Sequence, residues 1–253
     1  MDRTILLGSA LIVGALPGAA LAEPVLMISI DGLQPADVIE ADKRGIDIPN
    51  LKRFVREGSY ATGVTGVLPT VTYPSHTTLL TGASPAKHGV VGNTTFDPMQ
   101  VNQGGWYWYA RDIRVATLWD AAAKAGLSTA SVHWPVSAGA TSIRWNIPQI
   151  WRTGHGDDAK LIKALATPGL VEGLEAELGP YAAGIDESIK SDENRGAFAA
   201  RLLTLAPDVV VAGWSTPVLP DVLPAQLRYL CYLAGSIKRM VRREHMARGL
   251  LVS

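Results

Sequence analysis

The pattern of hydrophobic and polar positions along the chain changes repeatedly between two periods. Continuous short apolar runs, typical of strands buried on both faces, occur at residues 25–30, 128–133 and 208–212. Residues 60–68 alternate loosely and predict another strand. Amphipathic or capped stretches predict helices at 50–58, 75–81, 117–125, 157–166, 167–178 and 191–205. Strands that alternate with helices in this way favour an α/β fold, a mostly parallel sheet with helices on both faces.

The helix expected at residues 75–81 has clear signals at both ends. Pro74 suits the first helical position and Gly82 the end, because proline has a helical φ and glycine can reverse the chain. Tyr73 then caps the helix. Thr72 lies just outside its positive end, where unpaired backbone N–H groups attract phosphate oxygens.

Composition limits the class of protein. The chain has 253 residues, 47% of them hydrophobic and 18% charged, which is typical of a globular protein with an ample core. One large α/β domain or two small ones fit this length. No stretch before residue 214 resembles a basic nucleic-acid footprint, so we expect no nucleic-acid-binding module. Cys231 is the only cysteine, which excludes an intrachain disulfide.

The character of the chain changes after residue 213. Residues 214–253 hold six Lys or Arg residues against two acidic ones, with three prolines followed by an amphipathic segment rich in arginine. No sheet pattern continues there. We interpret the segment as a basic tail with a solvated face and expect no stable membrane partner. An Arg-rich membrane-surface module at 238–248 is the alternative.

The N-terminus has the layout of a secretory signal peptide. Residues 5–16 form an apolar core, Pro17-Gly18 break it, and Ala20-Leu21-Ala22 place small residues two apart before Glu23. We predict cleavage after residue 22 and a periplasmic or secreted protein. An N-terminal membrane anchor or a core helix is the alternative interpretation.

Two residues carry candidate chemistry. Asp31 follows the apolar run at 25–30, at the strand end where open α/β sheets place ligands, and its carboxylate suits a divalent cation. Alone, the pair Asp31-Gly32 is more typical of a turn than of a metal site. The hydroxyl of Thr72 needs a base or a metal to become a nucleophile, and an isolated threonine at this place is otherwise an ordinary turn or cap residue.

Residues 69–76, Pro-Thr-Val-Thr-Tyr-Pro-Ser-His, are similar to the Pro-Thr-x-Thr-aromatic-Pro-Asn-His motif of the type I phosphodiesterase/nucleotide pyrophosphatase family, within the alkaline phosphatase superfamily. Ser75 departs from the usual asparagine. The similarity covers about residues 24–212. It implies an alkaline-phosphatase-like fold, with residues 23–213 forming the N-terminal part of a catalytic domain whose C-terminal half is incomplete.

The resemblance also implies roles for individual residues. Thr72 is the expected nucleophile and bridges a pair of zinc ions, one of which Asp31 ligates. Asn93 donates a hydrogen bond to a phosphoryl oxygen, and Tyr73 stacks on a nucleobase or another leaving group. The implied activity is metal-dependent hydrolysis of phosphodiester or pyrophosphate bonds in a small molecule or nucleotide. His76 and His88 are expected to make structural hydrogen bonds.

The family's later metal ligands do not follow the strand expected at 208–212. After residue 212 the only acidic residues are Asp221 and Glu244 and the only histidine is His245. We therefore hypothesise a truncated or frameshifted chain with weak zinc affinity and little or no turnover, since Asp31 and Thr72 supply too few ligands. Another activity of the superfamily (phosphomonoesterase or sulfatase-like) and an inactive remnant are the alternatives.

Overall fold

A computed structural model describes residues 25–99, 105–150, 157–184, 188–205, 209–212, 229–233 and 251–252. Its centre is a six-stranded sheet in the order β3-β2-β4-β1-β5-β6, in which all neighbouring strands run parallel. The strands are β1 (Val25–Ser29), β2 (Thr129–Val132), β3 (Trp145–Ile147), β4 (Val209–Ala212), β5 (Tyr229–Leu233) and β6 (Leu251–Val252). The expectation of a parallel α/β sheet is confirmed. The predicted signal peptide at 1–22 lies outside the described residues.

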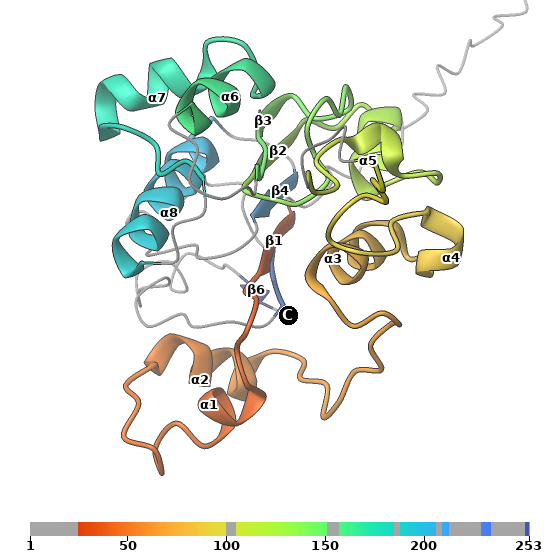
Figure 1. The fold of residues 1–253 in the computed structure, drawn as a ribbon. Coiled ribbons are helices and arrows are strands. Elements are labelled where there is room, and N and C mark those ends of the chain that lie inside the picture. The colour runs from red at the N-terminus through yellow and green to blue at the C-terminus, as the bar shows by residue number, and fades with distance from the viewer. Residues whose placement is uncertain are drawn as a thin grey trace, which may run out of the picture.

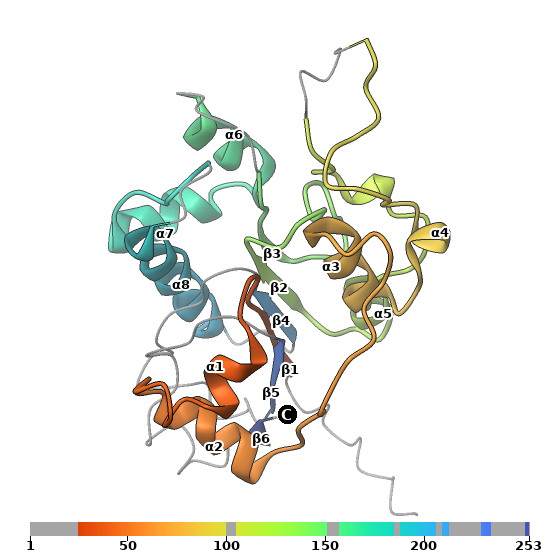
Figure 2. The same cartoon turned by 60° about the horizontal axis from the view of Figure 1, so that its bottom comes forward.

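Helices cover both faces of this sheet. They are α1 (Pro35–Ile39), α2 (Pro49–Glu57), α3 (Thr72–Thr81), α4 (Pro85–His88), α5 (Leu118–Lys124), α6 (Asp158–Leu165), α7 (Leu170–Leu178) and α8 (Ile189–Leu203), with a 3-10 helix η1 at Ala110–Asp112. In both views α3, α4 and α5 lie on one side of the sheet and α6, α7 and α8 on the other (Figure 1, Figure 2). Within the described ranges, no helix combines the length and apolarity that a bilayer span requires.

Alternate residues of β1 explain why both faces are covered. Leu26 and Ile28 belong to a buried cluster with Leu51 of α2, whereas Met27 packs on the opposite cluster with Leu80 of α3. Successive side chains of a strand point to opposite faces, so an unbroken apolar run needs a layer on each side. Burying a Leu or Ile side chain stabilises the fold by roughly 1.5–3 kcal/mol. This packing holds β1 against α2 on one face and against α3 on the other.

Residues 60–68 form no strand, so the prediction made for them is wrong. They lie in an extended connection between α2 and α3, and residues 60–66 are all exposed. Alternation indicates which side chains could face a core, but a strand also needs a hydrogen-bonding neighbour. No described strand provides one here.

The expectation that the sheet pattern ends at residue 213 is also wrong. Strand β5 pairs in parallel along the whole of β1, from Val25 opposite Tyr229 to Ser29 opposite Leu233. Strand β1 is therefore flanked on both sides, by β4 and β5. A central position makes the loop after β1 a natural place for a site.

All six predicted helices exist, with shifted ends. Helix α7 begins at Leu170 rather than at residue 167, because Gly169 adopts a left-handed conformation with φ 75°. Helix α8 begins at Ile189 rather than at residue 191. Its N-cap is Ser188, whose hydroxyl accepts a hydrogen bond from the Ser191 amide at 3.2 Å.

Candidate functional site

Asp31 lies at the carboxyl end of the central strand β1. It comes two residues after Ser29, the last residue of the strand, and Gly32 turns the chain with φ 80°. The turn and the site interpretations are therefore compatible, since the turn is present and the carboxylate also contacts a second segment. The side chain is half-buried. Its Oδ2 atom accepts a hydrogen bond from the Thr72 hydroxyl at 2.8 Å.

Thr72 is the first residue of α3, not a residue outside it. The helix was expected to begin at Ser75 with Tyr73 as its cap, but Val71 is the N-cap. Pro74 stands third in the helix, which costs no hydrogen bond because N–H groups of the first turn have no partner within the helix. The nucleophile candidate is thus held by helical backbone at the positive end of the helix dipole. Gly82 ends α3 in the left-handed conformation, as predicted.

Asn93 joins the site from the loop after α4. Its Oδ1 accepts a hydrogen bond from the Tyr73 amide at 2.9 Å, one of the first-turn donors of α3. Its backbone carbonyl accepts from the Tyr107 amide at 3.0 Å, which ties the loop to the 105–109 segment. Because the amide oxygen faces Tyr73, the NH₂ group of Asn93 is the donor that remains for a ligand.

Tyr73 points into protein. Its side chain is 1% exposed and packs with Val90 and Val136, and its ring meets the Trp106 ring edge-on at 5.2 Å. Burial raises the pKa of the Tyr73 phenol far above its usual value. The stacking role stays a prediction, and in this conformation the ring is covered. The aromatic segment around Trp106 packs beside the site and shields Tyr73.

His76 connects α3 back to β1. Its Nδ1 lies 2.8 Å from the Thr72 carbonyl oxygen, and its Nε2 lies 2.8 Å from Ser29 Oγ. Burial lowers the pKa of His76 below its usual range, and the Thr72 carbonyl and the charge of Asp31 oppose this shift. The expected structural hydrogen bonding of His76 is present. His88 is likewise buried and lies 3.0 Å from the Thr78 hydroxyl.

The site as described does not complete a metal centre. Asp31 and Thr72 bring two oxygen donors together, yet among the described residues no group of three or more His, Cys, Asp or Glu side chains could hold an ion. A two-metal centre needs several more ligands to fix its coordination and to neutralise its charge. The donor set seen here therefore falls short of the implied zinc pair.

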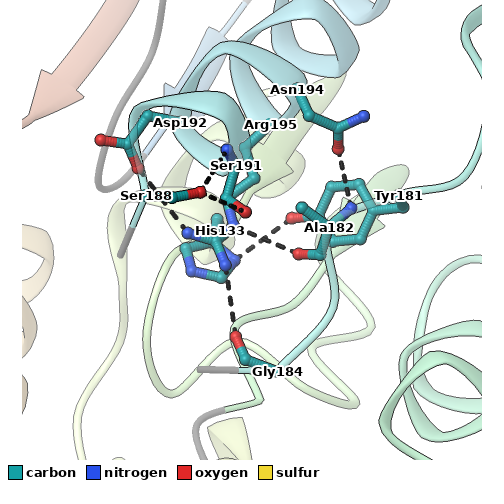
Figure 3. A network of polar contacts seen from close by, with 9 residues as sticks. All are labelled: His133, Tyr181, Ala182, Gly184, Ser188, Ser191, Asp192, Asn194 and Arg195. Carbon is teal, nitrogen blue, oxygen red and sulfur yellow. Dashed lines mark hydrogen bonds and ion pairs between the residues drawn. The ribbon is translucent and has the colours of Figure 1, made fainter. Parts of the chain in front are cut away.

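A second polar network lies between β2 and α8 (Figure 3). Arg195 is 2% exposed and donates from Nε to the Ala182 carbonyl and from Nη2 to the Gly184 carbonyl, each at 3.2 Å. His133, which follows β2, shares a hydrogen bond with the Tyr181 hydroxyl at 3.2 Å. The network fastens α8 to the chain before it, and it includes none of Asp31, Thr72 and Asn93.

Sequence reasoning missed two parts of this arrangement. The contact between Ser29 and His76 joins residues 47 positions apart, and only the motif around Thr72 hinted that His76 had a place in the site. The burial of Arg195 was missed as well, because a lone arginine in an amphipathic helix is usually solvated.

Comparison with known proteins gives consistent matches. A sequence model of the family described as type I phosphodiesterase / nucleotide pyrophosphatase matches residues 25–200. Ectonucleotide pyrophosphatase/phosphodiesterase family member 3 of Rattus norvegicus is 27% identical over 137 residues, which are 51% of this chain and 15% of that protein. The bis(5'-adenosyl)-triphosphatase ENPP4 of Bos taurus is 33% identical over 95 residues, 37% of this chain and 20% of that protein.

A solved structure shares the fold. The crystal structure of phosphonoacetate hydrolase from Sinorhizobium meliloti 1021 in complex with phosphonoacetate superposes with a TM-score of 0.53 and 22% identity, covering 76% of this chain and 46% of that one. The chain thus spans less than half of this neighbour and about a fifth or less of the two relatives.

Proposed function

The chain belongs to the type I phosphodiesterase/nucleotide pyrophosphatase family, and on that premise we propose that it is a hydrolase of phosphodiester or pyrophosphate bonds with Thr72 as nucleophile. One observation carries the proposal. The Thr72 hydroxyl, at the positive end of α3, donates to the Asp31 carboxylate at 2.8 Å although 41 residues separate the two. Family membership supports the reaction class, and the contact supports the choice of nucleophile.

In the proposed reaction Thr72, Asp31 and Asn93 each have one role. The Oγ atom of Thr72 attacks phosphorus in line with the leaving oxygen, so an Oγ–P bond forms while the P–O bond to the leaving group breaks. In the resting site Asp31 accepts a hydrogen bond from the Thr72 hydroxyl, which directs a lone pair of Oγ toward the substrate. As the Oγ–P bond forms, the proton passes to the Asp31 carboxylate, and the leaving oxygen departs with the electron pair of the broken P–O bond. The NH₂ group of Asn93 donates to a phosphoryl oxygen as charge develops there. Water later hydrolyses the Thr72 ester.

Zinc belongs to this proposal as the family's expected cofactor, supplying charge that activates the threonine. The described residues that would contribute to it are Asp31 and Thr72. Because they complete no metal centre, we propose weak zinc affinity and low turnover for this chain. An inert remnant of the family is the competing proposal.

The proposed substrate is a small phosphodiester or nucleotide. The names of the relatives, a nucleotide pyrophosphatase/phosphodiesterase and a bis(5'-adenosyl)-triphosphatase, support nucleotides with bridging phosphates. We also propose export after cleavage at residue 22, and a catalytic portion at 23–213 followed by a basic segment at 214–253. N-terminal sequencing of protein from the periplasm or medium tests the export proposal, which requires Glu23 as the first residue.

The test of the function is hydrolysis of bis(4-nitrophenyl) phosphate with added zinc. We expect slow hydrolysis that Thr72→Ala abolishes, while Thr70→Ala, two residues earlier and outside the helix, retains it. Hydrolysis that survives Thr72→Ala would sink the proposal. Faster release of nitrophenol from the corresponding phosphate monoester or sulfate ester would favour the other superfamily activities.

A further inference from the structure

Two side-chain bridges connect the end of β1 to the first two turns of α3. The first joins Asp31 to the hydroxyl of Thr72, and the second joins Ser29 to His76, each at 2.8 Å. A third contact links the bridges, because His76 Nδ1 lies 2.8 Å from the Thr72 carbonyl oxygen. Thr72 is thus held at both ends, by its hydroxyl on Asp31 and by its carbonyl on His76.

The partners determine where the hydrogens of the second bridge lie. A carbonyl oxygen only accepts, so the nitrogen facing Thr72, Nδ1, carries a hydrogen. In the neutral ring Nε2 is then the acceptor, and the Ser29 hydroxyl donates to it. Each ring nitrogen therefore has one partner with a defined direction, and neither contact uses the Thr72 hydroxyl.

The ring of His76 has little freedom to move. It is 6% exposed, and Trp134 packs against it edge-on with ring centroids 5.0 Å apart. Ser29 is 5% exposed and belongs to the central strand, which is paired on both sides. The contacts of His76 therefore connect the Thr72 backbone to β1, a strand with hydrogen-bonded neighbours on both sides.

We propose that His76 is a positioning residue: it holds the Thr72 carbonyl, and through it the first turn of α3, so that the Thr72 hydroxyl stays directed at Asp31, with Ser29 fixing the imidazole ring. The proposal rests on the proposed function of Thr72. His76 touches neither the phosphoryl group nor the leaving group in this scheme. It acts only through the nucleophile that it orients.

Two substitutions separate the two ring nitrogens. In His76→Asn the side-chain NH₂ group replaces Nδ1–H and keeps the bond to the Thr72 carbonyl. In His76→Gln the amide reaches the place of Nε2 and the bond to Thr72 is lost. The matched control is His88→Gln, because His88 is also buried, accepts from the Val90 amide at Nδ1 and lies at 3.0 Å from Thr78 through Nε2.

The first readout is the kinetics of bis(4-nitrophenyl) phosphate hydrolysis. We expect His76→Gln to lower kcat by about tenfold to a hundredfold with KM nearly unchanged, the size of effect that a misplaced reacting group produces. His76→Asn restores most of kcat. His88→Gln leaves kcat unchanged, even where it lowers the unfolding midpoint by as much as His76→Gln does.

The second readout needs no turnover. Three-bond couplings to the Thr72 methyl carbon in isotopically labelled protein report the χ1 rotamer. We expect one rotamer in the wild type, His76→Asn and His88→Gln, and averaged rotamers in His76→Gln. If His76→Gln does not fold, Ser29→Ala carries the test and is expected to show partial averaging.

The outcomes distinguish this inference from the function. A single Thr72 rotamer in folded His76→Gln, or in Ser29→Ala where that variant carries the test, overturns the positioning role and leaves Thr72 as nucleophile untouched. Absence of hydrolysis in the wild type counts against the proposed function, while the rotamer measurement still decides whether His76 orders Thr72.

Discussion

At the scale of single residues, the site depends on where three short polar groups lie. Asp31 and Thr72 face each other, and Asn93 is turned so that its oxygen faces the helix and its NH₂ group remains available. The pair Asp31 and Thr72 was predictable, because the motif around Thr72 and the strand before Asp31 are both local patterns. The orientation of Asn93 was not, since it depends on a backbone amide of another segment.

Asp31→Ala tests whether the carboxylate binds metal. We expect the variant to take up less zinc than the wild type in an equilibrium titration, because it loses the charged oxygen of the pair. Asp37→Ala, which removes an exposed carboxylate paired with Arg44, is the matched control and should titrate like the wild type. Equal stoichiometry and affinity in Asp31→Ala and wild type would favour the inert remnant.

His133 makes stability depend on pH. Burial, followed by the charge of Arg195, holds the pKa of His133 well below its usual 6.5. The unfolded chain therefore binds a proton below that pH while the folded protein does not, and stability falls as the pH drops below it, by at most about 1.4 kcal/mol per pH unit for this residue.

The measurement is guanidinium unfolding across about pH 5 to 8. His133→Asn keeps a polar group near Nδ1 and tolerates the positive φ of 55°, so it should fold and show a shallower slope. His76, whose pKa is also lowered, leaves a residual slope. An unchanged slope in His133→Asn would contradict the argument.

At the scale of elements, the ends of helices were the least predictable feature. Pro74 is compatible with any place in a first turn, so its presence alone did not reveal that α3 begins at Thr72. Gly82 left a clearer signal, because a left-handed residue ends a helix abruptly, whereas Gly169 was predicted to lie inside a helix and instead precedes it. The strand expected at 60–68 failed for another reason, since its alternation does not supply a neighbouring strand.

Helix α5 allows a direct test of capping. Thr117 accepts from the Asp120 amide at 3.2 Å, while the Thr117 amide donates to the Asp120 carboxylate at 2.8 Å, forming a capping box. Thr117→Ala should lower the free energy of unfolding by about 1 kcal/mol. The control is Ser84→Ala at the N-cap of α4, where the side chain makes no cap hydrogen bond and little change is expected. Equal effects of the two variants would refute the capping argument.

At the scale of the whole molecule, the alternation of patterns predicted a parallel sheet with helices on both faces. It did not predict which segments of the chain supply all of the strands. Strand β5 lies between a proline-containing stretch and an arginine-rich one, so its short apolar run was not recognised as a strand. It nevertheless pairs with the central strand β1. Long-range parallel pairing leaves no local signal, because the paired residues Val25 and Tyr229 are 204 positions apart in the sequence.

Removing residues 214–253 tests how much that pairing contributes. The shortened chain loses β5 and β6 and exposes one edge of β1, so we expect a lower unfolding midpoint and more aggregation. The matched control is the chain without residues 1–22, the predicted signal peptide, whose midpoint should equal that of the full chain. A shortened chain as stable and soluble as the full one would show that β5 does not support the sheet.

The central claim is that the oxygen of Thr72 bonds to phosphorus, and a single-turnover trapping experiment tests it most directly. Protein with added zinc is mixed with bis(4-nitrophenyl) phosphate, quenched in acid, digested and analysed by mass spectrometry. The account predicts a nitrophenyl phosphoryl group on Thr72, absent from the corresponding peptide of Thr72→Ala. An unmodified Thr72, or a label on another residue, would contradict it.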